Sequence, residues 1–83
     1  MMRKQELLNR ISIDPRVMVG QPCIRGTRLT VHHILNILAF GMTIDEIVQQ
    51  YDGLTRDDIA ACLLFASEAL ANTSFVPLAA SAT

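Results

Sequence analysis

The sequence predicts a mainly α-helical domain, in which three helices form a helix-turn-helix unit behind a short N-terminal β-ribbon or arm. Three observations support this fold class. Helical hydrophobic periodicity runs from about residue 31 to 71, each periodic segment begins at a capping residue, and Gly-containing turns separate the segments. A chain of 83 residues has the length of one domain.

The first helix is expected over residues 31–40. Thr30 is a favourable N-cap, and apolar residues follow it at the spacing of one helix face. Gly41 stands just past the last periodic turn, at the position where a residue with positive φ commonly ends a helix. These signals predict both ends of the helix.

The second helix is expected over residues 44–51. Thr43 and Glu46 have the spacing of a capping box, and the residues after them alternate between an apolar stripe and an outward polar face. A tight turn at residues 52–54 contains Gly53 and leads to the next periodic segment. Two helices joined by such a turn are the pattern of a helix-turn-helix. The apolar stripe comprises Ile44, Ile47, Val48 and Tyr51.

The third helix is expected over residues 56–71. Thr55 can cap it, and two aspartates in its first turn interact favourably with the positive end of the helix dipole. This helix is apolar on nearly every side, so a second buried face is expected beside the core stripe. We assign that face to contact with another chain; the alternative is that the N-terminal segment of the same chain covers it. The core stripe comprises Ile59, Cys62, Leu63, Ala66 and Leu70, and the second face includes Ala61, Leu64 and Phe65.

The N-terminal third is not expected to be helical. Residues 11–13 alternate like a short strand that Asp14-Pro15 ends, and residues 23–25 are a candidate second strand after a turn. The predicted organisation is a basic arm over residues 1–10, a helix-turn-helix domain over 11–71 and a short C-terminal tail over 72–83.

The net charge of −1 hides an uneven distribution of charge along the chain. All but one of the seven Lys and Arg residues lie in the first 28 residues, and all but two of the eight Asp and Glu residues follow them. A basic N-terminal segment is common in proteins that bind the phosphate backbone of nucleic acids. We therefore expect the front of the chain to contact a polyanion.

Arg25 and Arg28 stand on either side of a Gly-Thr pair, directly before the first predicted helix. Planar guanidinium groups suit phosphates and guanine edges, whereas the third helix offers the single cation Arg56 beside two carboxylates. The alternative is that both arginines pair with Asp45, Asp57 and Asp58 of the helical body. The hypothesised DNA-binding residues are Arg16, Arg25, Arg28, Thr30, His32, Thr55 and Arg56, with further phosphate contacts from Arg3, Lys4 and Arg10.

No catalytic site is expected from the sequence. His32 and His33 are adjacent and face different directions on a helix, so they cannot chelate one metal together. Cys62 lies on the expected core stripe, and Cys23 lacks a His–acid companion. Neither a P-loop nor a G-x-G-x-x-G motif is present. We expect no enzyme activity, no cofactor and no bound metal.

The N-terminus carries charges where a signal peptide has its apolar core, and no apolar run approaches the roughly 18 residues that span a membrane. A cytoplasmic protein without a membrane partner is therefore expected. A chain this short buries only roughly 60% of its unfolded surface, so a partner chain, in particular a homodimer, is also expected.

The stretch GQPCIRGTRLTV over residues 20–31 resembles the signature of the family catalogued as "domain of unknown function 433". The motif GMTIDEI over residues 41–47 is similar to that family too, and the resemblance runs from about Ile11 to Leu70. It implies a homeodomain-like helix-turn-helix domain of small bacterial proteins. It further implies a VapB-like antitoxin that binds a PIN-like nuclease toxin and represses its own operon.

Two functional hypotheses follow. The first is a DNA-binding antitoxin whose homodimer presents two basic arms to operator DNA. The alternative is a protein-interaction or oligomerisation module that binds no nucleic acid. In the tail, Phe75, Val76 and Leu78 either dock on a partner or fold back onto the core.

Overall fold

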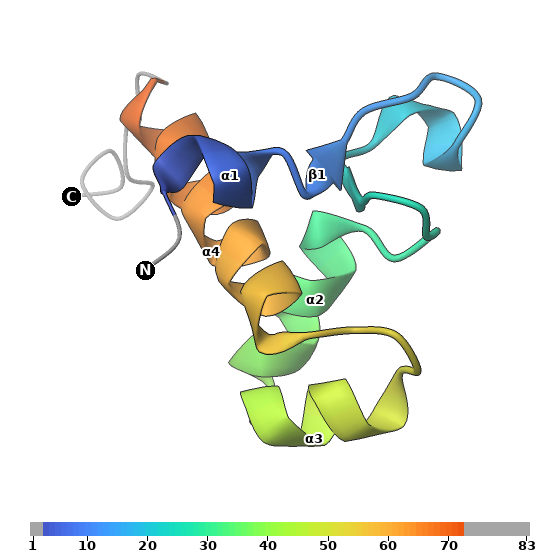
Figure 1. The fold of residues 1–83 in the computed structure, drawn as a ribbon, viewed down its shortest axis with the longest axis vertical. Coiled ribbons are helices and arrows are strands. Elements are labelled where there is room, and N and C mark those ends of the chain that lie inside the picture. The colour runs from blue at the N-terminus through green and yellow to red at the C-terminus, as the bar shows by residue number, and fades with distance from the viewer. Residues whose placement is uncertain (1–2, 73–83) are drawn as a thin grey trace, which may run out of the picture.

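The fold is organised around α4 (Arg56–Ala71), against which α1 (Lys4–Leu8), α2 (Val31–Ala39) and α3 (Ile44–Gln50) all pack (Figure 1). The structure, a computed structural model, describes residues 3–72. None of the helices in this part of the chain combines the length and the apolar character needed to cross a bilayer. The mainly helical class predicted from the sequence is confirmed.

The N-terminal part contains a two-stranded antiparallel sheet of β1 (Ile11–Ser12) and β2 (Cys23–Ile24), with the 3₁₀ turn η1 (Met18–Gly20) between them. The register pairs Ile11 with Ile24 and Ser12 with Cys23. On its other side, Cys23 forms a bridge to Thr30, the cap of α2. The predicted β-ribbon is therefore present, and it is hydrogen-bonded to the start of the helical body.

Each of α2, α3 and α4 begins where its capping residue predicts. The side-chain oxygens of Thr30, Thr43 and Thr55 each accept a hydrogen bond from the backbone N–H three residues on. Complete capping boxes start α3 and α4. The helices predicted over 31–40 and 44–51 each end one residue earlier than expected, whereas the bounds of the third are as predicted.

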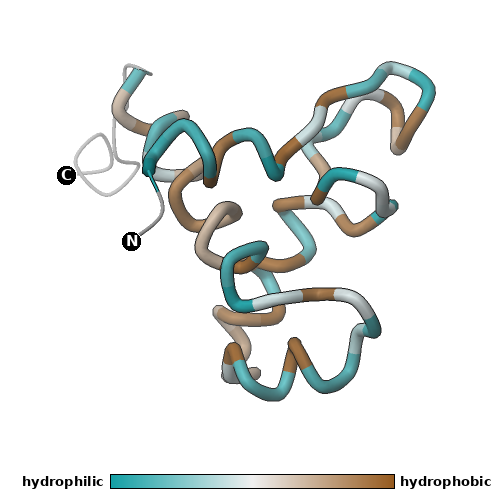
Figure 2. The backbone as a smooth tube through the Cα atoms, in the orientation of Figure 1, coloured by the Kyte–Doolittle hydropathy of each residue, from teal (hydrophilic) through white to brown (hydrophobic). Residues whose placement is uncertain are grey.

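The hydrophobic core lies where α2, α3 and α4 meet. Ile34, Ile47 and Ile59, one from each helix, are completely buried, and Ile11 and Ile24 close the core from the sheet. Figure 2 shows hydrophobic residues along the inner helices and hydrophilic ones on much of α1 and the outer side of α3. Burial of this shared apolar surface is the main force that holds the helices together.

The prediction that the N-terminal third lacks helix is wrong at Lys4–Leu8. This segment forms α1, which packs against α4; Leu7 contacts the core, and Lys4 Nζ lies 2.7 Å from Glu68 Oε1. A five-residue helix is not stable in isolation, so the tertiary contacts stabilise it. The described part of the predicted basic arm is therefore docked on the body (Figure 1).

The second face of α4 is covered largely by its own chain. Ala61 is completely buried within its own chain, so it is not available for the predicted interchain contact. Phe65 is half-buried and packs against the core of the same chain. The alternative, in which the N-terminal segment covers this side of the helix, is supported because α1 packs on α4 and Leu8 lines the same cavity as Phe65.

The predicted core stripe of α4 is correct at Ile59 and Cys62 and wrong at Leu63 and Leu70, which are exposed. The periodicity placed these leucines on the core side, but α1 and α2 cover the other sides of the helix. Leu64 is half-buried. The predicted contacts of Phe75, Val76 and Leu78 lie outside the described residues.

Candidate nucleic-acid interface

The loop from Arg25 to Arg28 connects β2 with α2 and is fixed by its own hydrogen bonds. Gly26 has a φ of +80°, a conformation that residues with a side chain rarely adopt. Thr27 Oγ1 donates to the Ile24 carbonyl at 2.8 Å and accepts from the Leu29 N–H at 3.0 Å. The loop is thus an ordered turn that sets the directions of its two arginines.

Arg25 is held by neutral partners. Its Nε donates to the carbonyl of Asn9 at 2.8 Å, and its Nη2 donates to the carbonyl of Ile11 at 3.3 Å. Carbonyl oxygens orient a guanidinium without cancelling its charge. Arg25 therefore keeps a full positive charge on an exposed side chain whose position is fixed.

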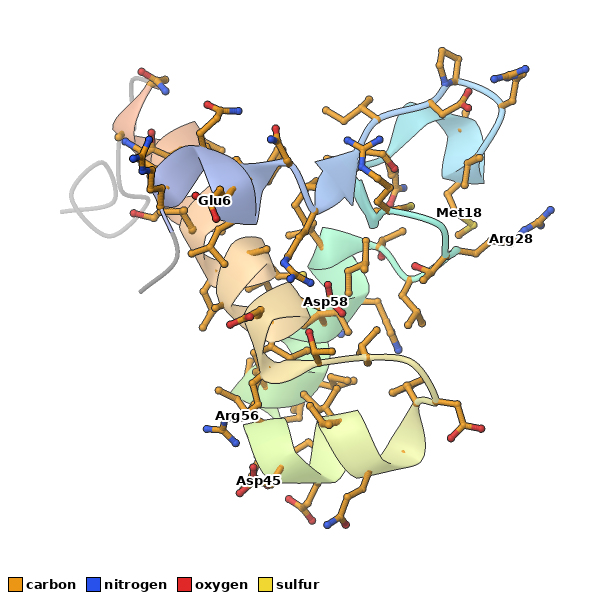
Figure 3. All side chains as sticks on the ribbon, viewed as in Figure 1. Glu6, Met18, Arg28, Asp45, Arg56 and Asp58 are labelled. Carbon is orange, nitrogen blue, oxygen red and sulfur yellow. The ribbon has the colours of Figure 1, made fainter. Side chains whose placement is uncertain are left out.

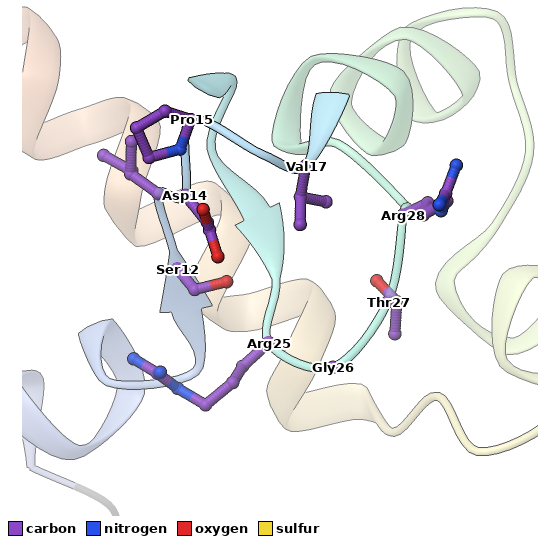
Figure 4. A pocket seen from close by; sticks show the side chains of 9 residues that line it. Ser12, Asp14, Pro15, Val17, Arg25, Gly26, Thr27 and Arg28 are labelled. Atoms are coloured by element: carbon purple, nitrogen blue, oxygen red, sulfur yellow. The ribbon is translucent and has the colours of Figure 1, made fainter. Parts of the chain in front are cut away.

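Arg28 extends away from the body into solvent (Figure 3). Its side chain makes no hydrogen bond or ion pair within residues 3–72. Figure 4 shows Arg25 and Arg28 on opposite sides of Gly26, pointing in different directions. This divergence suits contacts with two separate phosphates of a backbone better than convergence on one small anion.

A cleft of about 620 Å³ lies between this loop and the chain that follows β1. The carboxylate of Asp14 lines it, together with Ser12 and Thr27 (Figure 4). Arg16 makes a bidentate contact with Asp14, with Nε–Oδ1 and Nη2–Oδ2 distances of 3.1 Å each. These bonds lower the pKa of Asp14, so its charge remains inside the cleft. Arg25 and Arg28 line the same cleft, so it combines two arginines that lack a carboxylate partner within residues 3–72 with one carboxylate that Arg16 binds.

Most other cations predicted to contact DNA have carboxylate partners. Arg16 pairs with Asp14, Arg56 pairs with Asp45 (Figure 3), and Lys4 pairs with Glu68. Arg10 Nη1 lies 3.0 Å from Asp58 Oδ1. The alternative in which Arg25 and Arg28 use the acids of the helical body is therefore wrong, because those acids bind Arg10 and Arg56.

Two predicted contact residues have a structural role instead. Thr30 is buried, and its hydroxyl caps α2, so it is not available to a ligand. The Thr55 hydroxyl donates to Asp58 Oδ2 at 3.1 Å and caps α4. His32 is exposed in the first turn of α2, four positions after Arg28 in the sequence. Of the predicted residues, Arg3, Arg25, Arg28 and His32 are exposed and have no carboxylate partner within residues 3–72.

Two contacts of the site region were missed by the sequence reading. His33 Nε2 lies 3.2 Å from the Tyr51 hydroxyl, with the two rings edge to face, and so links α2 to the end of α3. Asp58 completes the capping box of α4 and binds Arg10. The Thr-x-x-Asp spacing is a signal for the first role, but no local signal points to Arg10, which lies 48 positions away.

Among the described residues, no group of three His, Cys, Asp or Glu side chains lies close enough together to hold a metal ion. Burial, with a smaller effect of the nearby Asp58 charge, raises the pKa of the Cys62 thiol to about 12. A thiol in that state is a poor nucleophile at neutral pH. Within residues 3–72, the arrangement offers cationic contacts on the loop between β2 and α2.

The profile of one protein family, described as "Protein of unknown function (DUF433)", matches residues 11–66. The chain belongs to the DUF433 family. A DUF433 member protein from Anabaena variabilis, known from a crystal structure, has 34% sequence identity and a TM-score of 0.70. The match covers 77% of this chain and 63% of that one, so this DUF433 chain spans less than two thirds of the length of its relative. Among curated proteins, no match is found.

Proposed function

We propose that this DUF433 chain is a DNA-binding antitoxin that represses its own operon and binds a PIN-like toxin. The DNA-binding part of this proposal is supported chiefly by the positive charge of the loop between β2 and α2. Arg25 and Arg28 are exposed and lack a carboxylate partner within residues 3–72, whereas Lys4, Arg10, Arg16 and Arg56 have one. Uncompensated cations on a fixed loop supply phosphate contacts.

The loop, rather than α4, is the proposed contact surface. The first turn of α4 carries Asp57 and Asp58, and its cation Arg56 is bound to Asp45, so phosphate is repelled there. The loop leads directly into the N-terminus of α2, where His32 is exposed. Backbone N–H groups at a helix start favour anions, which adds to the attraction of the two arginines.

Binding to a labelled duplex from the region upstream of its own gene, followed by fluorescence anisotropy over a salt series, tests this proposal. Arg28→Ala removes a side chain without an intramolecular partner, so it should lower affinity and reduce the salt slope by about 1 per bound chain. Arg56→Ala changes the charge equally at a site already bound to Asp45 and is the matched control. A folded Arg28→Ala variant that keeps the wild-type affinity and salt slope refutes the assignment.

The partner-binding half is supported by apolar side chains on α4. Leu63 and Leu70 are exposed on one side of this helix, which suits a toxin or a second copy of the chain. Co-expression with the product of the neighbouring gene tests it: copurification is expected, and Leu63→Glu should abolish it. Copurification without affinity for DNA would instead favour the second candidate, a protein-interaction module that binds no nucleic acid.

A further inference from the structure

A second cavity, of about 300 Å³, lies between α1, β1 and the C-terminal half of α4. Its apolar wall consists of Leu8, Ile11, Ile13 and Phe65. Glu68 and Asn72 line its end, and Glu68 is engaged with Lys4. The cavity is thus an apolar pocket whose one charged group already has a partner.

The wall of this pocket is only partly covered within residues 3–72. Ile13 is 61% exposed although it extends the same strand that buries Ile11, and Phe65 is half-buried. Covering such side chains with another apolar group removes them from water and is favourable. The pocket therefore has the character of a docking site for one or two apolar side chains.

The chain that follows α4 begins at the pocket itself, because Asn72, the last described residue, is part of its lining. The next residues, Thr-Ser-Phe-Val-Pro-Leu, carry no charge and include the apolar side chains of Phe75 and Val76. Only Thr73 and Ser74 lie between Asn72 and Phe75, so Phe75 can reach at most roughly 10 Å from Asn72. A docked segment therefore needs no long connection and brings no charge into the apolar site.

We propose that this pocket binds the C-terminal segment of the same chain, with Phe75 as the inserted side chain and Val76 beside it. The inserted side chains would then cover Ile13 and Phe65 of the pocket wall. This inference rests on the pocket and on the sequence of the segment, and it does not depend on binding to DNA.

The absence of tryptophan from the chain makes a direct test possible. In the full-length Phe75→Trp variant the single indole reports its own environment. We expect the emission maximum of the native variant to lie at a shorter wavelength than that of the same protein in denaturant. We also expect acrylamide to quench the native variant several-fold less than the denatured one. Emission and quenching equal to those of the denatured protein would overturn the proposal.

Two substitutions in the Phe75→Trp background test the location. Ile13→Asp places a charge in the wall of the pocket and should return the indole to solvent; Ile13→Gln serves the same purpose if the aspartate variant does not fold, as judged by circular dichroism. Leu70→Asp is the matched control, because Leu70 is 63% exposed and closer to the tail in sequence but does not line the pocket. Release by Leu70→Asp with no effect of Ile13→Asp would refute this location. A blue shift that disappears on dilution would mean that the segment of a second copy is bound, which also overturns the proposal.

Discussion

Replacing Asp58 with alanine tests whether one buried carboxylate holds the N-terminal part of the chain to α4. Its side chain is only 11% exposed. Oδ2 accepts hydrogen bonds from the Thr55 N–H at 3.0 Å and the Thr55 hydroxyl at 3.1 Å, while Oδ1 accepts from Arg10 Nη1 at 3.0 Å. Figure 3 shows Asp58 at the centre of the molecule, at the start of α4. The substitution therefore removes the carboxylate half of the α4 capping box together with an ion pair between distant segments.

The expected magnitude follows from these contacts. Loss of the carboxylate half of the capping box costs about 1 kcal/mol. Loss of a hydrogen bond between charged groups costs about 1.5 kcal/mol, below the range for a fully buried pair, because the Arg10 side chain is 34% exposed and water can solvate it. The free energy of unfolding should therefore fall by about 2–3 kcal/mol, which lowers the melting temperature of a domain this size by about 10–20 °C.

The assay is urea denaturation followed by circular dichroism at a fixed protein concentration, with Asp57→Ala as the matched control. Asp57 occupies the same helical turn, but its side chain is 54% exposed and lies 3.9 Å from Arg10, so its loss should cost less than about 0.5 kcal/mol. A double-mutant cycle of Asp58→Ala with Arg10→Ala should give a coupling energy of about 1–2 kcal/mol. Equal effects of the two aspartate substitutions, together with zero coupling, would refute this reasoning.

Two further predictions concern titratable groups. The Thr43 backbone N–H, and then its hydroxyl, lower the pKa of Glu46, so its stabilising effect is complete above its ordinary pKa and is lost as the pH falls through the lowered one. Glu46→Gln should accordingly lose less stability on acidification than the wild type does in parallel denaturant titrations. Because the pKa of Cys62 is raised to about 12, its thiol in a Cys23→Ala background should react with a disulfide reagent at pH 8 only as fast as the protein opens. Rapid labelling of the folded variant, at the rate of a free thiol, would contradict this expectation.

Local signals in the sequence predicted α2, α3 and α4 closely. A capping threonine and the apolar residues that follow it act within a few positions of each other, so Thr43 and Thr55 specify helix starts whatever surrounds them. The β-ribbon was also predictable, because Ile11 and Cys23 stand in short strand-like runs interrupted by turn residues. The Arg25–Arg28 loop, the core of the candidate site, followed from residue type and position alone.

Tertiary structure decided which of the predicted residues are available to a ligand. Whether a cation meets a polyanion depends on which carboxylate the fold brings to it, and Arg10 meets Asp58 across 48 positions of sequence. The helix at Lys4–Leu8 exists because it packs against α4 and Leu7 contacts the core, against which Phe65 of the same chain also packs. The sequence by itself therefore determined the helices, their caps and the basic loop. The pairing of charges and the covered side of α4 arise from contacts between distant segments, and no pattern within one segment encodes such contacts.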